Sequence, residues 1–403
     1  MAFRGNEWMN DDDLRLRLGS LVKKGYQRKE IDLFMKKEFP HYAWGCIKTL
    51  DRRLRHFELN YVNYETPLQD VKNAVKKELE GPGKLLGVRA MTKKLRMVHD
   101  VKVPRDLVNE VMYEHDPDGL EERQPCNKGK RRKGKFVTQG VNWVWSLDGH
   151  DKLMGFQNWT FPIALYGCYD TASRKVMFLK VWTSNSSPDI IGRWYFDHVF
   201  ETQKLPCMIR LDKGTETGLL ASIHAFLRKG HGDMSPEDTV HFGSSTTNRI
   251  ERWWKEIHER MEKFFKRQLL ELLERGYYDR EDESDRDIMA YIYIPIIQRE
   301  VDIFVELWNN SRSRFQKNSQ MPDGIPDVIY NNPEEFGLVD KGWDVSLEEL
   351  QAVAEVSGVL STQEDYIPLE MKQKCKDIIA EPENILSKDA ARLYLSLRRQ
   401  IKQ

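Results

Sequence analysis

The stretch Val-Trp-Ser-Leu-Asp-Gly occupies residues 144–149 and closes a short aromatic and apolar run on an aspartate, Asp148. Such a run predicts a β-strand with the aspartate at its C-terminal end. The pattern recurs in Met-Ile-Arg-Leu-Asp-Lys-Gly-Thr-Glu at 208–216, where Asp212 closes a second apolar run. A third acidic residue, Glu251, is the fourth residue of Asn-Arg-Ile-Glu-Arg-Trp-Trp-Lys, near the start of a long helical pattern. The three contexts together predict two strand-end aspartates, on strands expected to be neighbours in one sheet, and one helix glutamate.

The order of the elements around these residues predicts an α/β fold for residues 141–335. Only turn-like segments separate the first three apolar runs, which favours an antiparallel meander. The expected strands lie at 141–147, 160–168, 175–183, 207–211 and 239–242. The expected helices lie at 188–202, 217–228 and 246–274. The order strand-strand-strand-helix-strand-helix-strand-helix is typical of an RNase H-like core, a mixed five-stranded sheet flanked by helices.

Carboxylates in this arrangement predict a site for two Mg²⁺ or Mn²⁺ ions. Mg²⁺ takes oxygen ligands and keeps several waters, which substrate phosphate can replace. Two such ions, about 3.5–4 Å apart, stabilise the attacking and the leaving oxygen of an in-line displacement at phosphorus. The predicted catalytic and metal-binding residues are Asp148, Asp212 and Glu251. A metal-dependent reaction on a phosphodiester follows from this interpretation.

Other carboxylates in these segments have simpler interpretations. Asp151 lies in a turn after the first run, and Asp170 is expected to cap a turn with Ser173, the commoner role of an aspartate before small residues. Glu216, four residues after Asp212, is expected to support the site by orienting backbone or substrate at its mouth. Any single aspartate here is more often a turn or cap residue, so the metal-site prediction depends on three matching contexts.

Residues 1–60 predict a small helical DNA-binding unit. Apolar positions between 11 and 57 indicate three short helices, and the third, at 43–57, is amphipathic with a basic face. The cations of that face, predicted to contact DNA, are Lys48, Arg52, Arg53 and Arg55. Three helices with a basic third helix outline a helix-turn-helix unit. A small helical bundle with solvated charges is the alternative.

Residues 61–118 predict a second helical, helix-turn-helix-like unit, and residues 119–140 a basic linker. Helices are expected at 68–79, 87–98 and 104–114. In the linker, six cations fall within the eight residues 128–135. Those predicted to bind DNA are Lys130, Arg131, Arg132 and Lys133. Three interpretations stay open for this segment: a solvated flexible linker, a clamp on the DNA backbone, or a nuclear-import signal.

The bulk composition fits an intracellular protein with a polyanionic partner. Residues 1–140 hold 30 of the 63 Lys and Arg and 21 of the 63 Asp and Glu, which leaves 33 against 42 for residues 141–403. A basic front part favours nucleic acid as the partner. The five cysteines are scattered, which argues against a disulfide framework and a Cys-rich zinc site. The chain shows no apolar signal core and no apolar stretch long enough to cross a bilayer, so we expect a soluble protein.

Residues 141–258 resemble the catalytic core of retroviral-type integrases and their transposase relatives, the DDE superfamily. Three blocks carry the resemblance: Trp-Ser-Leu-Asp-Gly, Arg-Leu-Asp-Lys-Gly-Thr-Glu and Asn-Arg-Ile-Glu-Arg-Trp-Trp-Lys. More widely, residues 11–335 resemble transposon-derived integrase-core proteins of animal and fungal genomes. That family shares an Asp-Gly-x-Asp-Lys-Leu signature, which lies here at 148–153. The separation of Asp212 and Glu251 is slightly longer than is usual in integrases, which an inserted loop would accommodate.

The resemblance implies roles for individual residues. Asp148, Asp212 and Glu251 would form the metal-binding triad. Lys255, one helical turn after the glutamate, matches a position that contacts DNA near the reacting end in integrases; a solvated helix cation is the alternative. Asn248 precedes the glutamate as it does in the family and would position the loop at the site.

The sequence departs from the retroviral pattern on both sides of this core. It lacks the spacing of a His-His-Cys-Cys zinc module, so DNA-end binding would fall to the helical units at 11–115. In place of a C-terminal barrel, residues 285–310 predict a helix, and residues 336–403 an acidic helical tail of unassigned function. Trp253 and Trp254 are expected in the core and not as base-stacking platforms.

The first functional hypothesis is DNA integration or transposition by metal-dependent polynucleotidyl transfer, through 3′-end processing and strand transfer. It implies element ends and a target duplex as partners, a homo-oligomer, no membrane partner and a nuclear location. The second hypothesis is a domesticated integrase-derived protein that binds DNA or chromatin without catalysis. The third is an RNase H-like nuclease for RNA–DNA hybrids, which the duplex-reading helical units disfavour.

Overall fold

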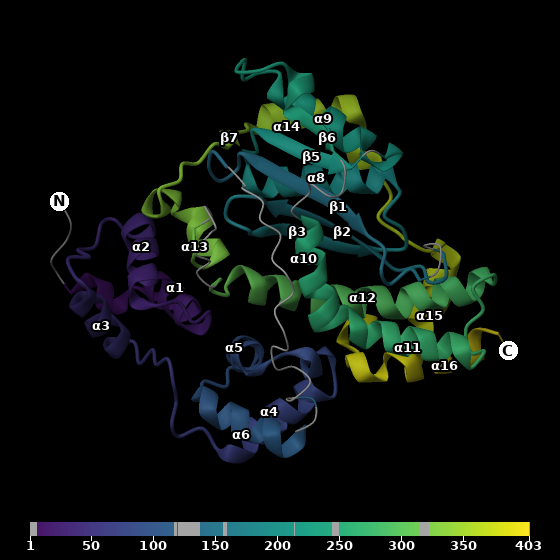
Figure 1. Ribbon diagram of the computed structural model, residues 1–403, viewed down its shortest axis with the longest axis horizontal. Coiled ribbons are helices and arrows are strands. Elements are labelled where there is room, and N and C mark those ends of the chain that lie inside the picture. The colour runs from purple at the N-terminus through teal and green to yellow at the C-terminus, as the bar shows by residue number, and fades with distance from the viewer. Residues whose placement is uncertain are drawn as a thin grey trace, which may run out of the picture. The chain divides into compact units, whose positions relative to one another are not determined.

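The computed structural model describes residues 6–116, 119, 138–155, 159–212, 214–243, 250–313 and 322–402, and of residues 215, 251 and 252 the backbone alone. The chain divides into two compact units, Met1–Arg132 and Lys133–Gln403 (Figure 1). Each unit has a hydrophobic core of its own.

The first unit begins with three helices that enclose a small apolar core. A 3-10 turn, η1 (Glu7–Asn10), precedes α1 (Asp12–Lys23), α2 (Arg28–Glu38) and α3 (Ile47–His56). Asp11 caps α1 by accepting a hydrogen bond from the Leu14 amide at 2.8 Å. The buried side chains include Leu14, Leu18, Leu21, Ile31, Phe34 and Leu54. The three helices predicted between 11 and 57 are thus confirmed.

A second group of helices follows in the same unit. It consists of α4 (Leu68–Leu79), the 3-10 turn η2 (Pro82–Leu85), α5 (Val88–His99) and α6 (Arg105–His115). Its core is made by Val71, Val75, Met91, Leu95, Val108, Val111 and Met112. The buried Glu78 carboxylate accepts from Lys94 Nζ at 2.8 Å and from His99 Nε2 at 2.7 Å. The Lys94 cation therefore belongs to the interior of this group and not to its surface.

The second unit is built on a five-stranded mixed sheet. The strands are β1 (Val144–His150), β2 (Ala164–Asp170), β3 (Val176–Trp182), β5 (Met208–Asp212) and β6 (Val240–Gly243), in the order β3-β2-β1-β5-β6. The first three strands form an antiparallel meander, and β5 and β6 continue the sheet in parallel with β1. This is the mixed five-stranded sheet expected of an RNase H-like core, so the predicted fold class is confirmed.

One face of this sheet is covered by α8 (Pro188–Thr202) and α9 (Gly218–Arg228) (Figure 1). The buried side chains that β1 and β5 contribute to this layer are Trp145, Leu147, Ile209 and Leu211. All four have odd numbers, and successive residues of a strand point to opposite faces. The even-numbered residues of β1 and β5, the two predicted metal-binding aspartates among them, therefore point to the other face.

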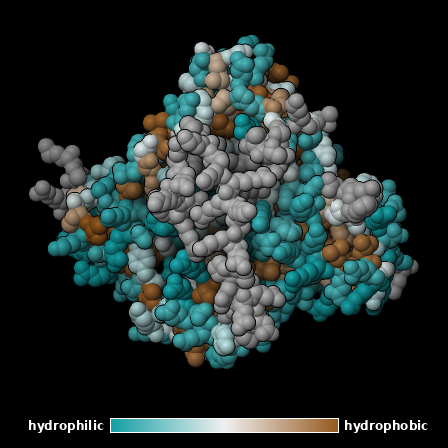
Figure 2. Space-filling model, in the orientation of Figure 1, coloured by the Kyte–Doolittle hydropathy of each residue, from teal (hydrophilic) through white to brown (hydrophobic). Residues whose placement is uncertain are grey.

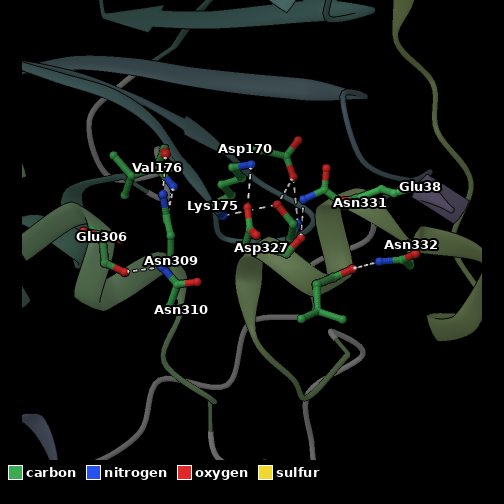
Figure 3. Close-up of polar contacts among 12 residues, drawn as sticks. Glu38, Asp170, Lys175, Val176, Glu306, Asn309, Asn310, Asp327, Asn331 and Asn332 are labelled. Carbon is green, nitrogen blue, oxygen red and sulfur yellow. Dashed lines mark hydrogen bonds and ion pairs between the residues drawn. The ribbon is translucent and has the colours of Figure 1, made fainter. Parts of the chain in front are cut away.

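Helix α12 (Glu283–Asn309) covers the edge strand β3 by hydrogen bonding as well as by packing. The Asn309 side chain accepts from the Val176 amide at 2.9 Å and donates to the Val176 carbonyl at 2.8 Å (Figure 3). Gln298 likewise accepts from the Val181 amide at 2.8 Å and donates to the Leu179 carbonyl at 3.0 Å. Eleven residues are close to three helical turns, so both amides reach the same strand edge. The helix predicted at 285–310 is confirmed.

The turn between β2 and β3 is held by Asp170, as its position before Ser173 predicted. The Asp170 carboxylate, labelled in Figure 3, accepts from the Ser173 backbone N–H at 2.7 Å, the Ser173 hydroxyl at 2.6 Å and the Asn142 backbone N–H at 2.9 Å. Complete burial raises the pKa of this carboxyl to about 6, against the opposing effect of those hydrogen bonds. This aspartate is a turn cap.

The long helical pattern that carries Glu251 is one continuous helix with a wider turn inside it. α10 (Ile250–Ile257) passes into a π-helical segment, His258–Glu262, and then into α11 (Lys263–Glu274). The end near residue 274 agrees with the sequence-based prediction, and the helix begins at Ile250 within the described residues. The π segment was not predicted.

Residues 336–403, expected as a separate acidic tail, contribute to the core of the second unit. β7 (Trp343–Asp344) pairs with β4 (Lys204–Leu205), and α14 (Leu347–Ser357) adds Leu350, Val353 and Ala354 to the cluster beneath α8 and α9. The remaining elements of this part are α13 (Pro326–Asn331), which precedes it, α15 (Leu369–Ile378) and α16 (Ala390–Ile401). Helix α16 is tied to α12 by Arg398, which bonds the buried Asp285 carboxylate at 2.7 Å. This segment is helical as predicted, but it packs as part of the fold.

Hydrophilic residues cover most of the described surface in the view of Figure 2, with hydrophobic residues scattered among them. Within the described parts of the chain, no helix combines the length and apolar character needed to cross a bilayer.

Candidate active site

Asp148 and Asp212 lie level with each other on adjacent parallel strands. The pairing of β1 with β5 sets Ser146 opposite Arg210, and each aspartate follows two residues later on its own strand. Neighbouring strands lie about 4.8 Å apart, and both aspartates point to the sheet face opposite α8 and α9. The prediction that the two strands are neighbours is confirmed. The prediction that Asp148 ends its strand was wrong, because β1 continues through His150, which pairs with Leu165 of β2.

Helix α10 crosses this face of the sheet, and it contacts the first aspartate directly. Trp254 Nε1 donates a hydrogen bond to Asp148 Oδ2 at 2.8 Å. The neighbour of Asp148 across the β1–β2 ladder is Gly167, and a Cβ at that position would lie 3.1 Å from the Trp254 ring. The absence of a side chain at residue 167 therefore leaves room for the indole. Trp253 and Trp254 are both buried, as predicted.

The second aspartate has an oxygen atom without a partner. Asp212 Oδ1 is buried and, among the described residues, has no hydrogen-bond donor. Burial raises the pKa of this carboxyl, and the nearby Glu216 carboxylate raises it further. A buried anionic oxygen without a donor is costly unless a cation or hydrogen bond compensates it. The position is therefore one at which a bound cation would lower the free energy of the folded protein.

Glu216 adds negative charge at the same end of the sheet. It lies in the 3-10 turn η4 (Thr215–Thr217) ahead of α9, with its carboxylate against the Cα of Gly214. The hydroxyl of the buried Tyr166 has no hydrogen-bond partner among the described residues. Burial raises the Tyr166 pKa well above its ordinary value, and the charges of Asp148, Glu216 and Asp212 add to this effect. The carboxylates together make this end of the sheet strongly negative.

The third predicted carboxylate belongs to the helix that crosses this face. Glu251 is a residue of α10, three positions before Trp254, and its side chain lies outside what the structure describes. Asn248 lies outside the described residues altogether. Lys255 is exposed on α10. The predicted roles of these three residues stay predictions.

The two strand aspartates fit a divalent cation, although they do not complete a site by themselves. In the part of the chain that the structure describes, no three His, Cys, Asp or Glu residues are grouped so as to hold a metal ion. The donors present, carboxylate oxygens on neighbouring strands with one oxygen uncompensated, are those that Mg²⁺ prefers. A complete site would need at least one further oxygen ligand.

Three cations of α3 are available to a polyanion. Lys48, Arg52 and Arg55 are exposed and follow one another at spacings of four and three residues, so they share one helix face. The basic run that includes Lys130, Arg131, Arg132 and Lys133 lies outside the described residues.

The prediction that Arg53 belongs to this exposed basic face was wrong. Its side chain is 2% exposed, and the guanidinium lies 3.9 Å from the centre of the Trp44 ring, with Trp8 and Tyr42 also close. Nη2 donates to the Ala43 carbonyl at 3.2 Å, and burial lowers the Arg53 pKa to about 10. Position 53 lies beside the apolar stripe of α3, and the surrounding rings enclose the cation.

The comparison with protein families agrees with this geometry. Residues 136–325 match the family model for an integrase core domain. This segment is similar to integrase core domains. A search of curated proteins found no match to the chain. The matched range contains all five strands of the main sheet, both strand aspartates and α10, so the integrase core coincides with the site described above.

The integrase core also contains a buried polar group that the sequence-based interpretation missed. His150 Nε2 and His258 Nδ1 each lie 3.0 Å from the same oxygen of Glu262, Oε2, which is fully buried. The His150 ring is stacked on Trp254 with ring centres 4.6 Å apart and planes 10° from parallel. The spacing of His258 and Glu262 suits a helical pair, but the sequence gives no signal that His150 joins them.

Proposed function

We propose that this chain integrates or transposes DNA as a DDE-type, metal-dependent polynucleotidyl transferase that carries out 3′-end processing and strand transfer. The observation that supports this most directly is the level placement of Asp148 and Asp212 on adjacent parallel strands of an integrase core. An integrase core implies DNA as the partner and phosphoryl transfer as the class of reaction.

In this proposal Asp148, Asp212 and Glu251 would hold two Mg²⁺ or Mn²⁺ ions. Glu251 is a residue of α10, three positions before Trp254, whose indole bonds Asp148. Bound ions would neutralise charge on a phosphodiester and lower the pKa of an attacking water or hydroxyl. Without ions, the clustered carboxylates repel a phosphate, which explains why such a site would require a divalent cation.

The chain's other residues in this proposal bind and orient DNA. Lys255 is exposed on the helix that carries Glu251, where it would meet a phosphate close to the reacting bond. Glu216 would orient backbone or substrate at the mouth of the site. Lys48, Arg52 and Arg55 form a charged face on α3 that suits the DNA backbone. Because two DNA ends must be held together, we expect a homo-oligomer on DNA. We also expect a nuclear location, where the DNA partner lies.

The decisive experiment is a joining assay. Purified protein is incubated with Mg²⁺ or Mn²⁺, labelled DNA that carries the flanking ends of its own locus, and a supercoiled target plasmid. The test variants are Asp148→Asn, Asp212→Asn and Glu251→Gln, and Asp238→Asn, an exposed carboxylate of the same unit, is the matched control. We expect joined products with wild type and control and none with the three test variants, all of which should still bind DNA.

A DNA- or chromatin-binding protein without catalysis is the second candidate, and the exposed cations of α3 would serve it equally well. The same assay separates the two. DNA binding without metal-dependent products in wild type would favour the non-catalytic protein, and joined products that persist in all three test variants would contradict the assignment of the triad.

A further inference from the structure

A chain of side-chain contacts connects the carboxylate of Asp148 to the interior of the second unit. It runs from Asp148 through the Trp254 indole and the His150 ring to the buried Glu262 carboxylate. Every member beyond Asp148 is at least nine-tenths buried: Trp254 is 5%, His150 7% and Glu262 0% exposed. Side chains that are buried and bonded in this way resist reorientation, because another rotamer would lose these contacts.

The last residue in this series of contacts, Glu262, is a charged carboxylate. The hydrogen bonds from His150 and His258 lower the Glu262 pKa, against the opposing effect of burial, so Glu262 is a carboxylate that accepts from both rings. A buried carboxylate with two donors is a strong orienting group for the imidazole beside it. The stacking with Trp254 transmits that orientation, because two flat rings 10° from parallel restrict each other's tilt.

Because of the π-helical segment, one helix can supply both Trp254 and Glu262 to this series of contacts. Trp254 and Glu262 are eight residues apart, which in a regular α-helix would leave them about 80° out of alignment. The wider π turn takes up one extra residue, so the eight residues act as seven and return to within about 20° of the same face. The segment lies at His258–Glu262, immediately after α10. Both side chains can therefore face β1.

We propose that Glu262, His150 and Trp254 are positioning residues that hold the Asp148 carboxylate in the orientation needed to bind a divalent cation. The inference depends on the proposed function, since that function assigns Asp148 to metal binding. None of the three residues touches substrate in this proposal. They act through Asp148 alone, as residues behind metal ligands do when they restrict a ligand's orientation.

The test measures cation binding without catalysis. Protein with ¹⁵N-labelled tryptophan gives one indole N–H resonance for each of the 11 tryptophans. The resonance that is absent in Trp254→Phe is that of Trp254. Titration of wild type with Mg²⁺ alone should shift this resonance. In Glu262→Gln, which preserves the size of the side chain, the concentration for half-saturation should rise about 10- to 100-fold. The double variant Trp254→Phe/Glu262→Gln lacks this resonance, so its Mg²⁺ affinity is measured from the rise in unfolding temperature with Mg²⁺. Because both residues act on Asp148 through the same contacts, the double variant should lose no more affinity than the more affected single variant.

Two matched controls separate positioning from general damage. Glu300→Gln changes another buried, hydrogen-bonded carboxylate of the same unit. Trp44→Phe removes another indole hydrogen bond, to the Phe39 carbonyl at 2.9 Å, in the first unit. Both should bind Mg²⁺ with wild-type affinity. Equal losses of affinity in controls and test variants would overturn the proposal.

The outcomes also distinguish this inference from the function on which it rests. A Mg²⁺-dependent shift of Trp254 that weakens in Glu262→Gln, together with absence of joined products in wild type, supports the positioning chain and contradicts catalysis. Joined products in wild type, with unchanged Mg²⁺ affinity in Glu262→Gln and Trp254→Phe, support the function and overturn the positioning chain. A Trp254 resonance that Mg²⁺ does not move in wild type overturns it as well.

Discussion

The indole of Trp254 donates to the carboxylate of Asp148 at 2.8 Å, although 106 positions of sequence separate the two residues. This bond joins the first strand of the sheet to the helix that carries Glu251. It places α10 against the sheet face to which Asp148 points, which residue spacing in the sequence could not show.

Asp212→Asn should stabilise the cation-free protein. The substitution removes the charge of a partly buried carboxylate. Its pKa is raised by burial and by Glu216, and its buried Oδ1 has no donor among the described residues. We expect a higher midpoint of thermal unfolding without divalent cations, by calorimetry. Wild type should gain about 2.7 kcal/mol when Mg²⁺ is present at a hundred times its dissociation constant, and the variant should gain little. Equal stabilisation of both by Mg²⁺ would remove Asp212 from the site.

The exposed arginines of α3, Arg52 and Arg55, should affect DNA binding and not the stability of the fold. Arg52→Ala and Arg55→Ala should leave the free energy of unfolding within about 0.5 kcal/mol of wild type. If these arginines contact phosphates, each substitution should reduce the slope of log affinity for DNA against log salt by about 1. Chemical denaturation and DNA binding at several salt concentrations check this.

Arg53→Ala should instead lower the free energy of unfolding by about 2–4 kcal/mol, because it empties a site enclosed by Trp44, Trp8 and Tyr42. Arg52→Ala, the neighbouring residue in the sequence, is its matched control. If Arg53→Ala unfolds like the control and weakens DNA binding, Arg53 has the DNA-contacting role that the sequence suggested.

Asp170 should make the stability of the second unit depend on pH. Its pKa is raised from 3.8 to about 6 in the folded protein, so the folded state holds this proton more tightly than the unfolded state. Its stabilising contribution is complete below about pH 4 and is lost as the pH rises through about 6, by up to about 3 kcal/mol. The difference in unfolding free energy between wild type and Asp170→Asn, measured from pH 4 to 7, should follow this loss. A difference that does not vary with pH contradicts it.

Leu350→Ala should destabilise the integrase core although the residue lies 25 positions beyond the matched segment. Leu350 is 1% exposed in the cluster that underlies α8 and α9, and removal of a buried leucine side chain costs about 2–5 kcal/mol. Leu360→Ala, at a position 58% exposed, is the control and should have little effect. Equal stability of the two variants would mean that residues beyond 336 are dispensable to the core.

The sequence predicted the elements of the sheet because short apolar runs between turn-like segments are a local signal. It also predicted that Asp148 and Asp212 lie on neighbouring strands, within an element order typical of an RNase H-like core. It placed the end of β1 too early, because Gly149 and His150 are not strand-like residues and the pairing with β2 holds them in the ladder.

Tertiary contacts decided what local patterns could not. Arg53 was placed with its charged neighbours, but the aromatic rings that enclose it come from positions 8, 42 and 44. The π segment has no distinctive composition, and its alignment of Glu262 with His150 depends on a residue 112 positions away. Leu350 belongs to an acidic stretch, and the sequence does not show that its apolar side chains pack in one cluster with those of α9.

The amides of Asn309 and Gln298 occupy the outward backbone groups of β3 as a sixth strand would. An incoming peptide would have to break these bonds before it could extend the sheet on this side. Extension of the sheet by another copy is therefore disfavoured at β3, because each new backbone bond there would replace one that α12 already makes.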